Sequence, residues 1–388
     1  MIILQVIFWL CVLMVFHSYV LFPFLLKWLS AHQRKNQSIK NNNTPAVTVI
    51  MAAFNEEAVI GQKLESILQS KYPKHLTEIL IGSDCSTDNT ENIVLQYAQQ
   101  HPNVYLYPFT ERQGKANIIN QLVGKAKGDI LILSDANVMF ASDTISQLII
   151  PFTDNSVGLV DTRMVNTNIK EEGISFQEKS YISREVSIKN REGILWGTMM
   201  GPFGGCYAIR RELYRQVPSN LLVDDFYICM AVLEQGYKAV NNLKAIVYED
   251  VSNDLGIEFR RKIRIATGDF QNLMIFSGML FSTRPGLSFS FWSHKVLRWL
   301  GPLFLIGALS TSIALSTQSN FYLLLLGIYS ISFLIPIIDM LLKKANIHNK
   351  ILRFITHFYT MNLALLAGLF IAIKGVKNNV WKPTERFQ

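Results

Sequence analysis

Val47-Thr48-Val49-Ile50-Met51-Ala52-Ala53-Phe54-Asn55-Glu56-Glu57 is the stretch that decides the fold. Its first half is apolar and rich in β-branched residues and follows Pro45, which predicts a buried strand over residues 47–51. Polar residues then begin at Asn55. Residues 56–69 carry apolar side chains at helical spacing, so the stretch predicts a strand, a polar loop and a helix in succession.

The same alternation of strand and helix continues along the chain. Strands are expected at residues 78–82, 104–107 and 129–133, and helices at residues 90–100 and 115–126. Strands that alternate with helices predict an α/β fold with a mostly parallel sheet and helices on both faces. Ligands of such sheets bind beyond the carboxyl ends of the strands, so the residues that follow each strand are the candidate functional residues.

Composition separates the ends of the chain from its middle. The 388 residues are 49% hydrophobic and 17% charged, which excludes a disordered chain. The apolar residues concentrate at the two ends, whereas residues 44–270 read as a water-soluble domain. The formal net charge of +8 fits an anionic partner: nucleic acid, anionic lipid or an anionic small substrate. None of the four cysteines forms a Cys-x-x-Cys pair, which argues against a zinc site.

The apolar ends predict membrane-spanning helices. Residues 2–26 are long enough to cross a bilayer, and basic residues follow them, which predicts an uncleaved anchor with its N-terminus outside. Further apolar runs lie at residues 297–315, 321–342 and 354–373. Counting crossings places the tail outside, whereas its basic residues favour the inside. Either one C-terminal run is re-entrant or interfacial, or the tail is an exception to the charge rule.

Five parts are therefore expected. They are a transmembrane anchor (1–30), a cytoplasmic domain (44–270), an interfacial amphipathic segment (271–295), C-terminal transmembrane helices (296–375) and a basic tail (376–388).

Acids and amides follow three of the predicted strands, in residues 52–57, 83–90 and 134–137. Helix capping alone would explain any one of these loops, but three at one sheet edge indicate a site. The chain has neither a P-loop motif nor a Gly-x-Gly-x-x-Gly after the first strand. Phosphate would then be held by a divalent metal on carboxylates with a lysine nearby. Asp135 and Asn137, facing one way in extended geometry, are the candidate ligands, and Lys115 opens a helix.

These loops resemble the motifs of membrane-bound family 2 glycosyltransferases with a GT-A, Rossmann-like catalytic domain. The pattern is similar to cellulose, hyaluronan and poly-N-acetylglucosamine synthases. Four motifs carry the resemblance, in the family's order: Asn55-Glu56-Glu57, Ser83-Asp84-Cys85-Ser86-Thr87-Asp88, Ser134-Asp135-Ala136-Asn137 and Val223-Asp224-Asp225. The third departs from the family's Asp-x-Asp, since Asn137 replaces the second acid.

The resemblance implies a role for each matching residue. Asp84 would bind the uracil of a UDP-sugar, Asp225 would be the catalytic base, and Asp224 would orient or assist it. Magnesium or manganese would lie on Asp135 and Asn137. The remaining residues expected to bind the donor are Ala52, Asn55, Glu57, Lys115 and Arg264.

A fifth motif is present only in part. Processive members of the family carry Gln-x-x-Arg-Trp, and residues 261–265 keep only its arginine, Arg264, which would contact the diphosphate. Ile265 replaces the tryptophan that stacks on the acceptor sugar, which favours single or limited transfer. Gly204 and Gly205 are expected in an acceptor-side loop, because glycine lets the backbone approach a sugar. Trp196 is either a stacking platform for the acceptor or part of the packing.

The resemblance therefore implies an inverting glycosyltransferase, and the basic residues after the first apolar run predict that it lies at the cytoplasmic face of the plasma or inner membrane. It would move a sugar from a nucleotide-sugar, of which UDP-sugars fit best, to a glycan or lipid-linked acceptor. A processive synthase that extrudes its polymer and a non-catalytic membrane subunit are the alternatives. Membrane lipids are expected partners. Nucleic acid is not, because the chain lacks a basic stripe with interleaved aromatics.

Overall fold

The computed structural model describes residues 1–31, 33, 44–167, 175–250, 255–345, 347 and 349–376. Within them the chain forms two compact units. The sheet unit contains Trp28–Asn253 and Ile275–Ser290, and the helical unit contains Met1–Lys27, Asp254–Met274 and Phe291–Gly375. Within this division, the described residues 255–274 group with the helices, and the expected boundaries of the five parts stay a prediction.

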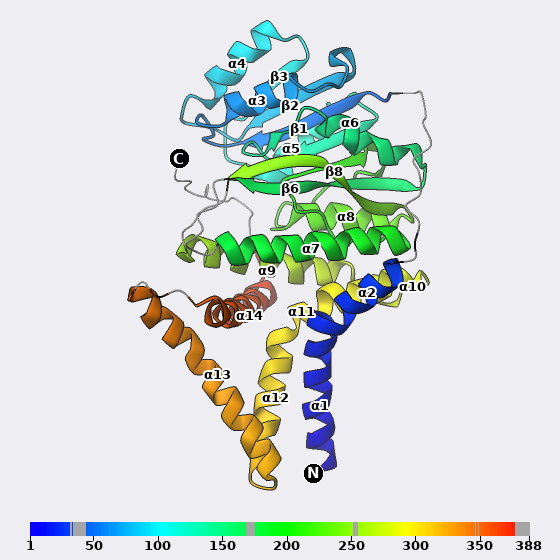
Figure 1. Cartoon of the computed structure of the whole chain (residues 1–388). Helices are drawn as coiled ribbons and strands as arrows, with labels where there is room; N and C mark the ends of the chain where they lie inside the picture. Colours follow the sequence, from blue (N-terminus) through cyan, green and yellow to red (C-terminus); the bar gives the residue numbers. More distant parts are fainter. Residues whose placement is uncertain are drawn as a thin grey trace. The chain divides into compact units, whose positions relative to one another are not determined.

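The sheet unit is built on an eight-stranded sheet in the order β3-β2-β1-β4-β7-β6-β8-β5 (Figure 1). Its first half is parallel, as predicted, and consists of β1 (Val47–Ala53), β2 (Thr77–Ser83), β3 (Val104–Pro108) and β4 (Ile130–Ser134). Nearly every residue of β1 and β2 is buried, which explains their continuous apolar runs.

The second half of the sheet departs from the parallel pattern. β7 (Cys206–Arg210) runs antiparallel between β4 and β6 (Val157–Thr167), and β8 (Lys238–Asp250) lies parallel to β6. The two-residue strand β5 (Met139–Phe140) ends the sheet by pairing antiparallel with β8. The strand direction therefore reverses between β4 and its neighbour β7. Asp135 directly follows the last residue of β4.

Helices pack on this sheet, and loops connect them to the strands. The bounds are α3 (Ile60–Leu68), α4 (Thr90–Gln100), α5 (Lys115–Val123), α6 (Thr144–Ile149), α7 (Ser175–Trp196) and α8 (Asp224–Glu234). The predicted helices at residues 90–100 and 115–126 are confirmed as α4 and α5. The helix expected from residue 56 begins instead at Ile60, because the preceding residues bond to the neighbouring loop.

The segment expected at the membrane interface packs against the sheet unit's own helices. It contains a 3-10 turn (Ser277–Phe281) and α10 (Pro285–Ser290). Arg284 Nη1 donates to the carbonyl of Leu233 at the end of α8, at 2.8 Å. Phe281 is 82% exposed, which suits a side chain that enters lipid. The interfacial placement stays a prediction.

In the helical unit, α1 (Ile2–Phe16) packs on α12 (Gly301–Ser316) through Phe8, Cys11, Ala308 and Leu315. Among the described residues, three helical stretches are long and apolar enough to cross a membrane: Ile2–Ser30, Asn320–Lys344 (α13) and Lys350–Lys374 (α14). A fourth exists if Pro285–Trp299 and Gly301–Ser316, bent by 61°, form one span. The predicted apolar runs are thus all helical. Residues 377–388 of the expected basic tail lie outside the described part of the chain.

The last helix lies in a different direction from the others of its unit. In Figure 1, α14 is seen nearly along its axis, whereas α1, α12 and α13 are seen from the side. α14 lies close against α9 (Leu255–Ile275): a β-carbon on Gly368 would be 2.6 Å from Cβ of Ala266. The orientation of α14 bears on which side of the membrane the basic tail lies, because the tail directly follows this helix.

Candidate active site

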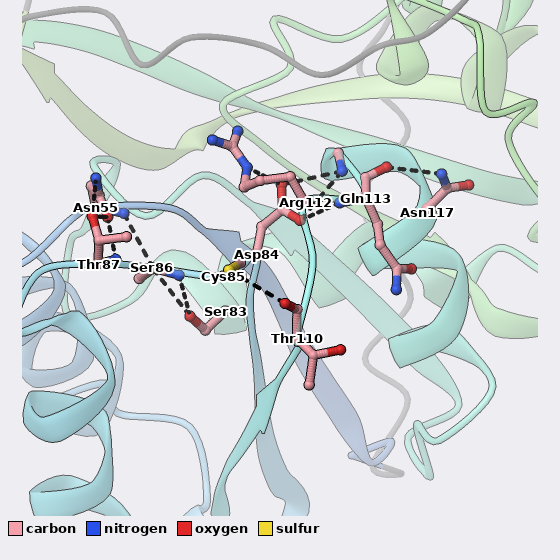
Figure 2. A network of polar contacts seen from close by, with 11 residues as sticks. Asn55, Ser83, Asp84, Cys85, Ser86, Thr87, Thr110, Arg112, Gln113 and Asn117 are labelled. Atoms are coloured by element: carbon pink, nitrogen blue, oxygen red, sulfur yellow. Dashed lines mark hydrogen bonds and ion pairs between the residues drawn. The ribbon is translucent and has the colours of Figure 1, made fainter.

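The loops after β1 and β2 are fastened to each other (Figure 2). Asn55, with a positive φ of 52°, accepts the Thr87 backbone N–H on Oδ1 at 2.8 Å. Glu57 accepts the Asn89 backbone N–H at 2.9 Å. Asn55 and Glu57 therefore order the loop that carries Asp84, and Ala52 lies half-buried on β1 beside this loop. Direct contact of these residues with a donor stays a prediction.

Asp84 directly follows β2, is 2% exposed, and is bonded to the residues that lead into α5. Its Oδ1 accepts the backbone N–H of Gln113 at 2.6 Å. Its Oδ2 accepts the Gly114 N–H at 3.1 Å and Arg112 Nε–H at 3.0 Å. A carboxylate offers about four acceptor sites, so residues 112–114 use most of them. The Arg112 guanidinium also stacks on Phe54, 3.3 Å from the ring centroid, and so forms one wall beside Asp84.

Lys115 brings three predicted site residues together. As the first residue of α5, it places Nζ 2.8 Å from Asp135 Oδ1 and 3.7 Å from Asp224 Oδ2. Burial opposes the charged ammonium, but the two carboxylates outweigh it and raise the pKa of Lys115. Lys115 therefore keeps its positive charge at neutral pH, in a position suited to a phosphate group.

Asp225 follows Asp224 in the first turn of α8. Its Oδ1 accepts the backbone N–H of Phe226 at 2.8 Å. Desolvation, reinforced by the charge of Asp224, raises the pKa of Asp225 to about 6. A carboxylate with such a pKa is a competent general base near neutral pH. Gly204, at φ +84°, lies against this carboxylate and so belongs to the same site.

The residues expected to hold a metal lie in a turn. Residues 135–138 are not extended, because Val138 N–H donates to the Asp135 carbonyl at 3.3 Å; the expectation of extended geometry was wrong. Asn137 is buried and donates to Glu249 Oε1 at 3.2 Å. The described residues contain no group of three acidic, histidine or cysteine side chains that could hold a metal. A half-buried carboxylate such as Asp135 still fits magnesium or manganese, which take further oxygens from substrate phosphates and water.

Two other predicted residues belong to α7 and α9. Trp196, at the end of α7, packs against α10: its ring lies 5.9 Å edge-on from the ring of Phe289, and a β-carbon on Gly286 would be 2.5 Å from its Cγ. This favours the packing alternative for Trp196. Arg264 lies on α9 in the helical unit, so its contact with the diphosphate stays a prediction.

Gly205, by contrast, belongs to the loop beside Asp135, because its carbonyl accepts the Asp135 backbone N–H at 2.9 Å. Gly205 has no room for a β-carbon, which would be 2.3 Å from Met164 Cε.

Three residues of this region were not identified from the sequence: Arg112, Glu249 and Lys63. Arg112 was detectable, because it lies in the loop after the third predicted strand. Lys63 was detectable as well, because it is three residues after Ile60 and four before Ile67, on the apolar face of its helix. Glu249 had no such signal, since 112 positions separate it from Asn137.

Comparison with protein families agrees with these motifs. The model described as glycosyl transferase family 2 matches residues 48–217, and that described as glycosyl transferase family group 2 matches residues 178–370. The chain is a family 2 glycosyltransferase, and the fold and enzyme class that its motifs implied are confirmed.

Similar curated proteins include makers of glycolipid and of polysaccharide. The chain is 27% identical to the β-monoglucosyldiacylglycerol synthase of a Nostoc species over 43% of its length, which is 36% of that protein. It is 25% identical to the poly-β-1,6-N-acetyl-D-glucosamine synthase of Staphylococcus aureus over 69% of the chain and 67% of that protein. It is 22% identical to the probable glycosyltransferase YdaM of Bacillus subtilis over 88% of the chain and 87% of that protein.

A solved structure shares the fold along almost the whole chain. It is a mannosyltransferase of Pyrobaculum calidifontis in complex with GDP-Man and Mn²⁺. The TM-score is 0.72 at 22% identity, over 95% of this chain and 99% of the other. The likeness establishes a GT-A fold.

Proposed function

We propose that the protein is an inverting glycosyltransferase that moves one sugar from a nucleotide-diphosphate sugar to a glycan or lipid-linked acceptor. The observation that carries this proposal is the cluster in which Lys115 contacts Asp135 and Asp224, next to Asp225. The cluster combines a positive charge for a leaving diphosphate with a carboxylate that can accept a proton.

In the proposed reaction the acceptor hydroxyl gives its proton to the carboxylate of Asp225. The acceptor oxygen forms a bond to the anomeric carbon, and the bond from that carbon to the diphosphate oxygen breaks. The nucleoside diphosphate leaves with the bonding electron pair. Lys115 stabilises the negative charge on the departing phosphate, and Asp224 keeps Lys115 in place.

Asp135 and Asn137 would hold a magnesium or manganese ion, and Glu249 accepts a hydrogen bond from the Asn137 amide. When bound, such an ion supplies a Lewis acid that neutralises charge on the diphosphate. Asp84 and the stacked Arg112 would form the pocket for the nucleobase.

Two features bear on the identity of the donor and product. The motif resemblance favours UDP-sugars, whereas the similar mannosyltransferase structure contains GDP-Man, so both nucleotides need testing. The similar proteins include synthases of a glycolipid and of a polymer. Ile265, in place of the tryptophan of processive members, favours the transfer of one or a few sugars.

We further propose that the sheet unit faces the cytoplasm of a cell or inner membrane. Basic residues occur at both ends of α14: Lys350 and Arg353 at one end and Lys374 at the other. A helix that crossed the bilayer would place one basic end outside, against the distribution of positive charge in membrane proteins. If α14 lies in the interface, α1, α12 and α13 provide three crossings and both ends of α14 stay inside.

Release of nucleoside diphosphate by the purified full chain in nanodiscs tests the function. The donors are UDP-glucose, UDP-galactose, UDP-N-acetylglucosamine, UDP-glucuronate and GDP-mannose, each with manganese, magnesium or chelator. We expect metal-dependent release from one donor, lost in Asp225→Asn. A ladder of many sugars would replace single transfer by processive synthesis. Unchanged glycan output from cells that carry Asp225→Asn would favour a non-catalytic subunit.

A further inference from the structure

Lys63 is a fully buried lysine on α3. Lysine is rarely buried completely unless its ammonium is paired. Its Nζ donates to Ser134 Oγ at 2.8 Å and to the backbone carbonyl of Val138. Nζ also lies 3.8 Å from the centroid of the Phe140 ring. Two oxygens and one aromatic face thus match the three N–H groups of the side chain.

Both oxygens that accept from Lys63 flank the turn with the proposed metal ligands. Ser134 directly precedes Asp135, and Val138 directly follows Asn137. One buried group of α3 therefore holds the two ends of this turn at a fixed separation. The same helix makes a second contact, since Ser66 Oγ accepts the backbone N–H of Phe140 at 3.2 Å.

The contact continues into the loop that carries Gly204. Ser134 Oγ donates to the carbonyl of Gly205 at 3.1 Å, and Asp135 N–H donates to the same carbonyl at 2.9 Å. Lys63, Ser134 and Gly205 thus form one line of hydrogen bonds. It connects α3 to the turn at Asp135 and then to the loop beside Asp225.

We propose that Lys63 is a positioning residue that fixes the turn of Asp135 and Asn137 for a divalent cation. The inference rests on the proposed metal site at Asp135. Groups that orient metal ligands typically change metal affinity by about 10- to 100-fold when they are removed. Lys63 reaches the ion only through the turn, so its loss acts on the geometry of the ligands and leaves them in the chain.

Binding of Mn²⁺ to the full chain in nanodiscs tests this inference. The binding is measured by electron paramagnetic resonance, with UDP or GDP present. Lys63→Met keeps the apolar stem and removes the amine. We expect the Mn²⁺ concentration at half-saturation to rise about 10- to 100-fold. Glu65→Gln, on the same helix but bonded to Tyr97 away from the turn, is the matched control and should bind Mn²⁺ like the wild type.

Ser134→Ala provides a second variant if Lys63→Met does not fold. It removes the hydroxyl between Lys63 and Gly205 and should weaken Mn²⁺ binding in the same direction. Wild-type half-saturation in the folded fraction of Lys63→Met, or in Ser134→Ala, would overturn the inference while leaving the metal site intact. A wild-type chain that binds no Mn²⁺ with either nucleotide would overturn the metal site and the inference together.

Discussion

Oδ2 of Asp225 lies only 2.4 Å from the position that a β-carbon on Gly204 would occupy. Real β-carbons do not approach oxygen so closely, so the carboxylate occupies space that only a glycine leaves open. Gly204 also has φ +84°, where side chains are disfavoured. The glycine that the sequence indicated as an acceptor-side residue therefore leaves the space that the proposed base occupies.

Gly204→Ala should abolish most transfer by displacing Asp225. The positive φ alone should cost about 1–3 kcal/mol of stability. Gly236→Ala separates the two effects, because Gly236 also has a positive φ, +91°, but a β-carbon there would have no neighbour within 4 Å. We expect the control to lose stability and keep its rate of nucleotide release. Equal activity loss in both variants would show that strain, and not the position of the base, limits the reaction.

Transfer should depend on the ionisation of Asp225. Because the base acts as a carboxylate and its pKa is raised to about 6, kcat/KM should rise with pH through about 6 and then level off. Asp225→Asn should lower the rate by about 10²- to 10⁴-fold and remove this limb. An acidic limb that persists in the variant would assign the titration to another group.

Ionisation of Asp225 should also lower the stability of the folded chain as the pH rises. The pKa of Asp225 is raised from 3.8 to about 6 by folding, so the folded chain binds more protons between these pH values. The contribution of Asp225 to stability is therefore lost as the pH rises through this interval. Melting temperatures of wild type and Asp225→Asn, compared at pH 4 and pH 7, measure it. The variant should gain relative stability at the higher pH.

The parallel half of the sheet could be predicted because each of its strands is a continuous apolar run between a turn and a helix. The other half could not, because β7 pairs with β4 and β6 across long stretches of chain and local pattern does not reveal such pairing. The motif acids Asp84 and Asp135 were identified from their positions after strands and from resemblance, and Asp225 was identified from resemblance alone. Lys63 and Glu249 act through contacts between distant segments, which only the structure supplies.

Asp84→Asn should weaken both the loop and nucleotide binding. An amide with its oxygen toward Gln113 would turn its NH₂ group toward Arg112 Nε–H, so that a donor faces a donor. Such a mismatch typically costs about 1–3 kcal/mol. Calorimetric titration with UDP and GDP, together with thermal melts, measures the two effects. Arg112→Met, which keeps the backbone bonds of Asp84, should melt closer to wild type; full nucleotide affinity in Asp84→Asn would exclude Asp84 from the base pocket.

A reporter fused after residue 388 should report a cytoplasmic C-terminus. If α14 lies in the interface, a fused green fluorescent protein fluoresces and a fused alkaline phosphatase is inactive. A fusion at Gln318, between α12 and α13, is the control and should give the opposite pair of results. Active alkaline phosphatase at both positions would mean that α14 crosses the bilayer and that the basic tail is an exception to the charge rule.

Asn137→Asp should restore the acid that family motifs carry at this position and make the chain more dependent on metal. The new carboxylate would lie beside Glu249, whose Oε1 is 3.2 Å from the Asn137 amide nitrogen. Two like charges so close destabilise each other unless a cation or a proton lies near them. We expect a lower melting temperature than wild type in chelator, a larger rise on adding Mn²⁺, and half-saturation at a several-fold lower Mn²⁺ concentration. Asn137→Ala, which removes the amide without adding charge, should show no larger rise in melting temperature with Mn²⁺ than the wild type does. An Asn137→Asp chain that melts identically in chelator and in Mn²⁺ would place the ion away from this turn.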